Sequence, residues 1–154
     1  MKQLELVRHA PRDPEADRLS QAGRALAASV GRSRKGVAYS AVFVSPAERA
    51  AETAAWFLRG ANRQLPPEHA VVPGLAGKDA TGGSPEGLAA GIRSLFIELD
   101  DGGRALAISH TPFVERAAFG LVGREVEPMR ELEGILITQH DDGSISIEEL
   151  RREE

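Results

Sequence analysis

Short apolar runs along the chain are separated by longer segments in which apolar residues recur at helical spacing. The runs that predict buried strands are residues 3–7, 41–44, 70–72 and 105–108. Polar residues or proline bound each run, which is typical of strands within a sheet. Near the C-terminus, residues 134–138 and 144–147 alternate around Asp142-Gly143. That pattern predicts an antiparallel hairpin, because Asp-Gly favours a tight turn.

Capping residues mark where the intervening helices begin. The helical segments are expected at residues 20–31, 45–60, 84–99 and from 111 onward. Ser20 and Ser84 are good N-caps for the first and third of these helices. In the second helix, Ser45 is expected to be the cap, Pro46 to occupy the first helical position and Glu48 to complete a capping box.

The order of these elements predicts an α/β fold. Strands that alternate with helices favour a three-layer α/β/α sandwich around a mostly parallel sheet, to which the C-terminal hairpin adds antiparallel strands. No internal repeat, linker or low-complexity tract interrupts this order, so we expect one domain over residues 1–154. In such a sheet, ligands bind outside the carboxyl ends of the strands.

Composition narrows the classes of function. The net charge is −4, which is unfavourable for a dedicated nucleic-acid-binding protein because no excess of cations faces the phosphates. Cysteine is absent, so disulfides, cysteine–zinc sites and thiol catalysis are excluded. The chain has no apolar run of membrane-spanning length and no signal-peptide pattern. We therefore expect a soluble, cytoplasmic protein whose core needs neither disulfide nor metal.

Polar and charged residues gather where three of the predicted strands end. Arg8-His9 follows the first strand, residues 45–49 follow the second and Ser109-His110 follows the fourth. Because the carboxyl ends of parallel strands meet at one edge of a sheet, we expect these side chains to lie close together. A metal site there is disfavoured, since no acidic ligand stands at a comparable strand end and the arginines would repel a divalent cation.

An anionic ligand suits this set of residues better. Arginine presents paired donors that match phosphate oxygens, and the helix N-termini expected at Pro46 and Pro112 add backbone N–H groups aimed the same way. Two neighbouring cations disfavour the protonated form of an imidazole, so a histidine held there keeps its lone pair near neutral pH. Such a histidine is a competent nucleophile toward phosphorus.

The residues at these strand ends stand within short sequence blocks. The blocks are residues 6–10 (LVRHA), 19–27 (LSQAGRALA), 44–54 (VSPAERAAETA) and 108–112 (ISHTP). In this order and spacing they resemble the blocks of the histidine phosphatase (phosphoglycerate mutase-like) superfamily. There they correspond to an Arg-His-Gly signature, the segment that follows it, a Ser-Pro-x-x-Arg-Ala-x-x-Thr-Ala block and a second-histidine motif. The resemblance spans residues 4 to about 118, which is most of the chain.

Within that superfamily, the chain most resembles the short SixA-type phosphohistidine phosphatases. It has the Ser-His-x-Pro form of the second-histidine motif and a C-terminal hairpin, and it lacks the large insertions of the mutases. The resemblance implies two-step hydrolysis without metal or cofactor, in which His9 becomes phosphohistidine and water then cleaves that intermediate. Arg8, Arg49 and His110 would bind the phosphoryl oxygens, and the backbone N–H of Thr111 is a further candidate donor.

The chain departs from the family pattern in places that affect the site. Ala10 replaces the glycine that follows the nucleophile, and a small side chain should be tolerated there. Asp17-Arg18 stands where short SixA-type members often carry Arg-Pro. Arg18 is therefore only a secondary candidate for contact with the phosphate.

A proton donor is the least certain component of the site. Larger family members place an acid after the third strand, whereas residues 75–79 here read LAGKD. Asp79 and Glu86 are the nearest candidates for a proton donor. A missing acid would favour activated or P–N substrates over alkyl phosphates, because an alkoxide is a poor leaving group without a proton.

Several of these residues also have a simpler structural interpretation. His9 on its own would be a hydrogen-bonded structural histidine at a strand end. Ser45 is interpreted as a helix cap rather than a catalytic serine, since no Gly-x-Ser-x-Gly elbow surrounds it. Arg49 is unfavourable against the helix dipole in a first turn, which favours an anionic partner. His69 and His140 are expected to be exposed bystanders.

The sequence leaves more than one function open. The first is a metal-independent phosphatase that acts on phosphohistidine or another phosphorylated protein group through a phosphohistidine intermediate. The second is a small-molecule phosphomonoesterase of the same superfamily, whose specificity would lie in loops 10–19 and 73–84. The third is a non-catalytic phosphate-binding module, against which the intact His9 and His110 argue. The expected partner is a phosphorylated protein or small metabolite, with no nucleic acid and no membrane, and the oligomeric state is not predicted.

Overall fold

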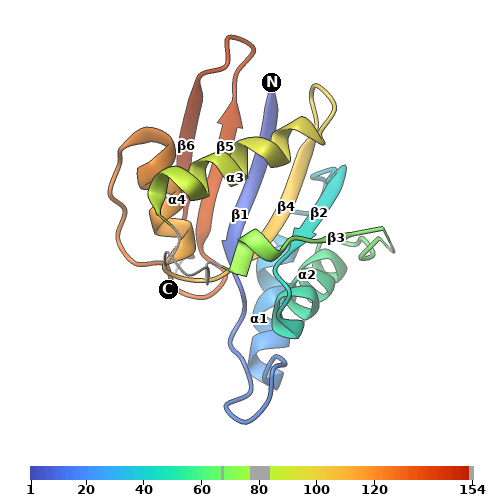
Figure 1. Cartoon of the computed structure of the whole chain (residues 1–154). Helices are drawn as coiled ribbons and strands as arrows, with labels where there is room; N and C mark the ends of the chain where they lie inside the picture. Colours follow the sequence, from blue (N-terminus) through green and yellow to red (C-terminus); the bar gives the residue numbers. More distant parts are fainter. Residues whose placement is uncertain (67, 77–83, 153–154) are drawn as a thin grey trace.

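The computed structural model of the chain describes residues 1–66, 68–76 and 84–152. These residues form a sheet with helices on both of its faces (Figure 1). The strands are β1 (Lys2–Arg8), β2 (Ala41–Val44), β3 (Ala70–Val71), β4 (Arg104–Ser109), β5 (Gly134–Gln139) and β6 (Ile145–Leu150). The helices are α1 (Gln21–Arg32), α2 (Glu48–Gly60), α3 (Pro85–Ile97) and α4 (Phe113–Val122), with a 3₁₀ turn at Pro73–Ala76.

The six strands lie in the order β3-β2-β4-β1-β5-β6. Strands β1 to β4 run parallel to one another, whereas β5 is antiparallel to β1 and β6 is antiparallel to β5. The predicted α/β class, the mostly parallel sheet and the C-terminal hairpin are therefore confirmed. Gly143 occupies the hairpin turn with a φ of 85°, a conformation that glycine adopts without a steric penalty.

The register of the central strands brings three chain segments to one edge. Arg8 pairs with Ser109, and Val44 pairs with Ile108. The carboxyl ends of β1, β2 and β4 are therefore level with one another. The residues that follow these strands, which the sequence marks as candidate site residues, emerge side by side at this edge.

Apolar residues from the two faces of the sheet make two core clusters. Along β1, successive side chains point to opposite faces, as the pleat requires. Leu4 and Leu6 belong to the cluster under α3 and α4, whereas Val7 belongs to the cluster under α1 and α2. Burial on both faces explains why the central strands are almost continuous apolar runs, because a parallel sheet is covered on both sides.

Two glycines let α1 and α2 pack in close contact. A Cβ atom on Gly31 would lie 1.8 Å from the backbone oxygen of Phe57, and one on Gly60 would lie 1.9 Å from that of Ala28. A larger residue at either position would push the helices apart. This contact matters for function because α2 carries one of the candidate arginines in its first turn.

The start of α2 differs from the sequence prediction. The helix begins at Glu48, and its N-cap residue, Ala47, makes no side-chain cap. The Asp17 carboxylate accepts hydrogen bonds from the backbone N–H groups of Glu48, at 2.9 Å, and Arg49, at 3.2 Å. The predicted capping box of Ser45, Pro46 and Glu48 is therefore wrong, because a carboxylate from another loop satisfies these N–H groups. The caps predicted at the first and third helices, Ser20 and Ser84, are confirmed.

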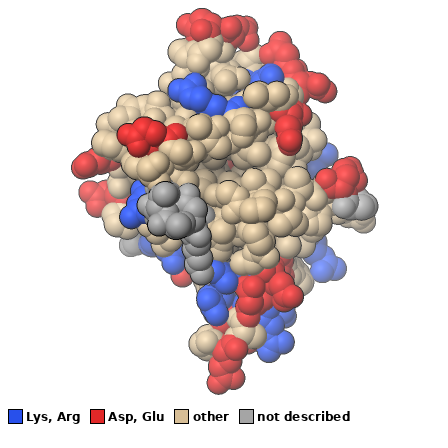
Figure 2. Space-filling view, viewed as in Figure 1, with Lys and Arg blue, Asp and Glu red and all other residues tan. Residues whose placement is uncertain are grey.

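Charged side chains are distributed over the surface without segregating by sign on the face shown in Figure 2. Lys and Arg lie interspersed with Asp and Glu around a largely uncharged central area. Within the described parts of the chain, none of the helices has both the length and the apolar character needed to cross a membrane.

Candidate active site

His9 is held at the carboxyl end of β1 with its ring in a defined tautomer. Its backbone N–H donates to the oxygen of Ser109 at 2.9 Å, and its side chain is largely buried. The Nδ1 atom lies 2.8 Å from the carbonyl oxygen of Ala10. Because a carbonyl oxygen only accepts, Nδ1 carries the hydrogen. The lone pair of His9 is therefore on Nε2.

The turn after His9 is tied to α2 by one threonine. The backbone N–H of Ala10 donates to Thr53 Oγ1 at 3.0 Å, and that hydroxyl donates to the backbone oxygen of Arg49 at 2.7 Å. Ala10 itself is fully buried in the core under α1 and α2. The structure thus accommodates alanine where the family pattern has glycine.

Arg49 lies between the two histidines. Its Nε is 3.4 Å from His9 Nε2, and its Nη2 is 3.5 Å from His110 Nδ1. Its Nη1 pairs with Asp17 Oδ1 at 2.9 Å. The carboxylate that caps α2 therefore also orients the guanidinium, so the position of Arg49 depends on the loop that precedes α1.

His110 follows β4 and faces both Arg49 and Ser45. Its Nε2 is 2.7 Å from Ser45 Oγ, and its ring centroid is 5.0 Å from that of His9, with an interplanar angle of 63°. These two contacts, one at each ring nitrogen, orient the imidazole of His110. Ser45 is buried and orients this second histidine rather than capping α2.

Arg8 presents its guanidinium from the end of β1. Its Nη1 donates to the backbone oxygen of Met129 at 2.7 Å, and its Nη2 lies 3.9 Å from the Glu131 carboxylate. Its Nε is buried and has no acceptor among the described residues. The remaining N–H groups of this guanidinium belong to a side chain that lines the hollow described below.

The surroundings of His9 lower the pKa of its imidazole. Burial is the largest cause, because the charged form loses its hydration, and the positive charges of Arg49 and Arg8 add to it. The hydrogen bond to Ala10 and the charge of Glu131 oppose the shift. The sequence argument for a neutral histidine rested on the two arginines, and the structure adds burial as the stronger cause.

These side chains line one hollow at the carboxyl edge of the sheet. It has a volume of about 390 Å³. The lining residues are Arg8, His9, Arg12, Arg49, Ala76, His110, Thr111, Pro112, Phe113 and Glu131. The five candidates from the family motifs (Arg8, His9, Arg49, His110 and Thr111) are thus brought together by the fold.

Other candidates from the sequence lie elsewhere. Glu86 is exposed in the first turn of α3 and does not line the hollow. Arg18 pairs with Asp13 at 3.3 Å, and 62% of its side chain is exposed. Asp79 lies outside the described residues. Among the described residues, no group of three or more histidine and acidic side chains is arranged to hold a metal ion.

The sequence argument did not assign Arg12, which lines the hollow, nor three residues that contact the site groups, Asp17, Ser45 and Glu131. Asp17 and Glu131 lie in loops without periodic pattern, and no local signal marks either of them as part of a strand-end site. Ser45 does stand at a strand end, but its position before proline favoured the interpretation as a helix cap. Each contacts the site through residues that are distant in sequence.

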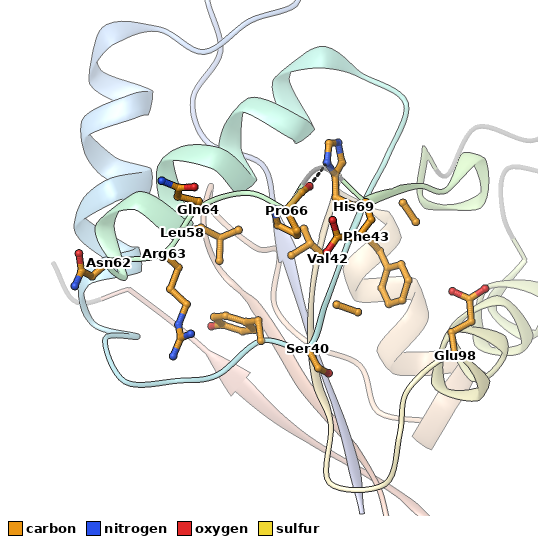
Figure 3. Close-up of a pocket in the computed structure, with 14 residues that line it drawn as sticks. Ser40, Val42, Phe43, Leu58, Asn62, Arg63, Gln64, Pro66, His69 and Glu98 are labelled. Atoms are coloured by element: carbon orange, nitrogen blue, oxygen red, sulfur yellow. Dashed lines mark hydrogen bonds between the residues drawn. The ribbon is translucent and has the colours of Figure 1, made fainter.

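A larger hollow of about 470 Å³ lies at the amino end of β2 and has a different character (Figure 3). Asn62, Arg63 and Gln64 lie on one side of it, and Glu98 lies on the other. His69 is at its edge, where Nδ1 donates to the backbone oxygen of Pro66 at 2.8 Å. The polar groups here do not converge on one point, unlike those around His9.

Part of the chain matches a known protein family. A family model described as the histidine phosphatase superfamily (branch 1) matches residues 4–76. The search of curated protein sequences finds no relative of the chain.

Solved structures similar to this one cover almost the whole chain. The protein histidine phosphatase SixA, complexed with tungstate, has a TM-score of 0.76 at 24% identity and covers 97% of this chain and 96% of its own. The phosphoglycerate mutase of Bacillus anthracis has a TM-score of 0.77 at 16% identity, over 96% and 91% of the two chains. A phosphoserine phosphatase mutant of Entamoeba histolytica in complex with phosphoserine has a TM-score of 0.72 at 16% identity, over 97% of each chain.

At these identities the structural likeness shows the fold. The predicted phosphoglycerate mutase-like fold is confirmed by these neighbours. The family model matches the N-terminal blocks that carry Arg8, His9 and Arg49. The resemblance that the sequence motifs predicted is therefore confirmed.

Proposed function

We propose that this chain is a phosphatase of the histidine phosphatase superfamily that needs no metal and works through a phosphohistidine intermediate on His9. One observation carries the proposal. The lone pair on His9 Nε2 faces Arg49 Nε at 3.4 Å, at the edge of a hollow that Arg8 and His110 also line. A nucleophilic nitrogen surrounded by cationic and N–H donors matches a phosphoryl group at the moment of transfer.

In the first step, the lone pair of His9 Nε2 forms a bond to phosphorus. The bond from phosphorus to the leaving atom breaks, and its electron pair stays with that atom. Negative charge on the non-bridging oxygens is stabilised by the guanidinium groups of Arg8 and Arg49 and by His110. The hydrogen bond from His9 Nδ1 to Ala10 holds the ring orientation during the attack.

In the second step, water attacks the phosphorus of the intermediate. The P–N bond breaks, and its electron pair returns to His9 Nε2. Both hydrogens of the water leave with the phosphate, which loses one proton to solvent near neutral pH. The enzyme is then regenerated with the same tautomer of His9 with which it began.

Phosphohistidine, or another phosphorylated group on a protein, is the substrate class that we propose. Asp79 and Glu86 were the candidates for a proton donor, and Glu86 does not line the hollow. Without a donor, an alkyl ester would have to release an alkoxide, whereas a phosphorylated nitrogen leaves as a neutral amine or imidazole. The structural likeness to a protein histidine phosphatase supports the same class.

A small phosphorylated metabolite is the second candidate substrate. The likeness to a phosphoserine phosphatase and to a mycobacterial glucosyl-3-phosphoglycerate phosphatase supports it. The two substrate classes share the same chemistry at His9 and differ in the leaving group, so substrate comparison separates them.

The test is phosphate release from a panel of phosphohistidine peptide, p-nitrophenyl phosphate, phosphoserine and phosphorylated sugars. We expect turnover by the wild type, none above background by His9→Ala, and wild-type rates for His140→Ala, which removes an exposed histidine on the β5–β6 turn. Equal release by the wild type and His9→Ala would contradict the proposal. Vanadate binding without any turnover would instead indicate a phosphate-binding module.

A further inference from the structure

The segment that enters β5 is fastened to the backbone of Arg8. The N–H of Leu132 donates to the oxygen of Arg8 at 3.0 Å, and the N–H of Arg8 donates to the oxygen of Glu133 at 2.9 Å. The Arg8 side chain adds a bond to the oxygen of Met129. The turn before β5 is therefore built around the residue that precedes the nucleophile.

Leu132 in this turn has an unusual backbone conformation. Its φ is 64°, and its side chain is buried. A branched residue in the left-handed region is strained, and such strain persists only where the surroundings over-determine the backbone. The Glu133 carboxylate contributes by accepting bonds from the backbone N–H groups of Arg130 and Arg152, each at 2.9 Å. The pKa of Glu133 is lowered to about 2 by these bonds and by Arg130 and Arg151, against the effect of burial.

This turn determines the position of Glu131. Its side chain lines the hollow, and its Oε2 lies 3.9 Å from Arg8 Nη2. Its charge also acts on His9, whose pKa it raises against the effect of the arginines. Among the described residues that line the hollow, Glu131 carries the one carboxylate. A negative group is thus held beside a site for a phosphoryl dianion.

A carboxylate in this place would repel a phosphoryl group unless a positive group lies between them. Arg8 provides one positive neighbour, but at 3.9 Å this pair is at the outer limit of an ion pair. The oxygens of a carboxylate that lies beside a guanidinium are acceptors of hydrogen bonds. The role of Glu131 is therefore to accept rather than to donate.

We propose that Glu131 is a specificity residue that binds the protonated nitrogen group of a phosphoramidate substrate. This proposal rests on the proposed function and narrows its substrate class to phosphorylated nitrogen. In N-phosphorylated imidazole, the ring carries a positive charge and an N–H on the nitrogen that is not bonded to phosphorus. Glu131 accepts a hydrogen bond from that N–H. His9 Nε2 forms its bond to phosphorus as the P–N bond breaks, and the imidazole leaves neutral with the electron pair and its N–H.

The test compares Glu131→Gln with Glu148→Gln, which changes an exposed carboxylate on β6. We expect kcat/KM for phosphohistidine peptide to fall about ten-fold in Glu131→Gln, as for a lost hydrogen bond to a charged group. Relative to p-nitrophenyl phosphate, whose leaving group carries no positive charge, the preference for the peptide should fall by the same factor, because effects of Glu131 on Arg8 and His9 act on both substrates alike. Glu148→Gln should match the wild type on both substrates. An equal loss on both substrates, or a larger loss on the ester, would overturn the proposal.

A binding measurement keeps this proposal separate from the proposed function. In a His9→Ala background, which cannot turn over, Glu131→Gln should weaken phosphohistidine peptide binding about ten-fold and leave inorganic phosphate binding unchanged. Unchanged peptide binding would overturn the role of Glu131. Absence of turnover by the wild type, together with the expected difference in binding, would refute the phosphatase and leave the role of Glu131 in recognition intact.

Discussion

Strand β1 carries one charged cluster at its middle and another at its carboxyl end, and the two clusters differ in how their charges are compensated. At the middle of the strand, Glu5 is fully buried. Its Oε1 accepts from the hydroxyl of Tyr39 at 2.8 Å and from Arg104 Nη2 at 2.6 Å, and its Oε2 accepts from Arg34 Nε at 2.9 Å. Burial and the charge of Glu5 raise the pKa of Tyr39, so this hydroxyl remains a donor.

At the carboxyl end of the same strand, the charges are compensated loosely. The Glu131 carboxylate lies 3.9 Å from Arg8 Nη2, whereas the Glu5 carboxylate lies 2.6 Å from Arg104 and 2.9 Å from Arg34. His9 and Arg49 line an open hollow. A buried carboxylate whose two oxygens both accept hydrogen bonds has a structural role. Donors that converge on an open hollow are, in contrast, available to bind a ligand.

The largest effect on stability is expected at the closed cluster. Glu5→Ala leaves Arg34 and Arg104 beside an emptied, buried position, so the free energy of unfolding should fall by about 3–5 kcal/mol. Activity per folded molecule should stay near the wild-type value, because neither Glu5 nor the residues that bond to it line the hollow at His9. Urea unfolding and an active-site titration measure the two quantities. A loss below about 1 kcal/mol would show that the cluster is not a stabilising unit.

The largest effect on activity, apart from loss of His9, is expected at Arg49. Arg49→Ala removes the guanidinium that faces both histidines, and kcat/KM should fall about 10²–10³-fold, as when one donor to a developing oxyanion is removed. Arg49→Lys should recover only part of this loss, since an ammonium cannot present two donors in a fixed fork. Arg63→Ala, at an exposed position after α2, is the matched control. Steady-state kinetics with p-nitrophenyl phosphate would contradict the role if Arg49→Ala matched this control.

A smaller effect is expected at Ser45. Ser45→Ala removes the hydroxyl that lies 2.7 Å from His110 Nε2, so this ring should lose its fixed orientation and kcat should fall about ten-fold. Ser20→Ala offers a contrast, because it removes a true helix cap and should lower the unfolding free energy by about 1 kcal/mol at unchanged kcat. A kcat for Ser45→Ala equal to that of the wild type would show that the serine has no role in positioning His110.

The smallest effect is expected in the pH dependence. His9 must be unprotonated to attack, and its pKa lies below the ordinary value of 6.5. In the pH profile of kcat/KM, the midpoint of the acid limb should therefore lie below pH 6.5. Arg49→Ala should move the midpoint of its remaining activity to higher pH, because the charge of Arg49 contributes to the lowered pKa of His9. Burial, the larger cause, remains in this variant, so the movement should be partial. An acid limb above pH 6.5 in the wild type would contradict this assignment.

The same shift predicts how stability depends on pH. A lowered pKa means that the unfolded chain binds a proton at a higher pH than the folded chain does. The contribution of His9 to stability is therefore fully present above pH 6.5 and decreases as the pH falls through the interval between the unfolded and folded pKa values. Thermal unfolding of the wild type and His9→Ala over this range measures the difference.

The sequence by itself determined the elements and the part of the site that stands directly at strand ends. Arg8, His9 and His110 follow apolar runs that form buried strands, and parallel strands bring such positions to one edge. Arg49 could be placed because the first turn of the helix after β2 lies at the same edge. These assignments depend only on local patterns and on the rule that the carboxyl ends of parallel strands meet at one edge of a sheet. The sequence was therefore sufficient for them.

Only the tertiary structure decided how these residues are held. Asp17 caps α2 and orients Arg49, Ser45 contacts His110, and Glu131 lies beside Arg8. The first and last of these residues stand in loops without periodic pattern, and each partner is far away in sequence. From the local sequence alone, a serine before proline is expected to cap a helix. The register between β2 and β4 instead places Ser45 beside His110. Local chemistry thus places the candidate reactive groups, whereas long-range packing sets the tautomer and the lowered pKa of His9 and the position of Glu131 beside Arg8.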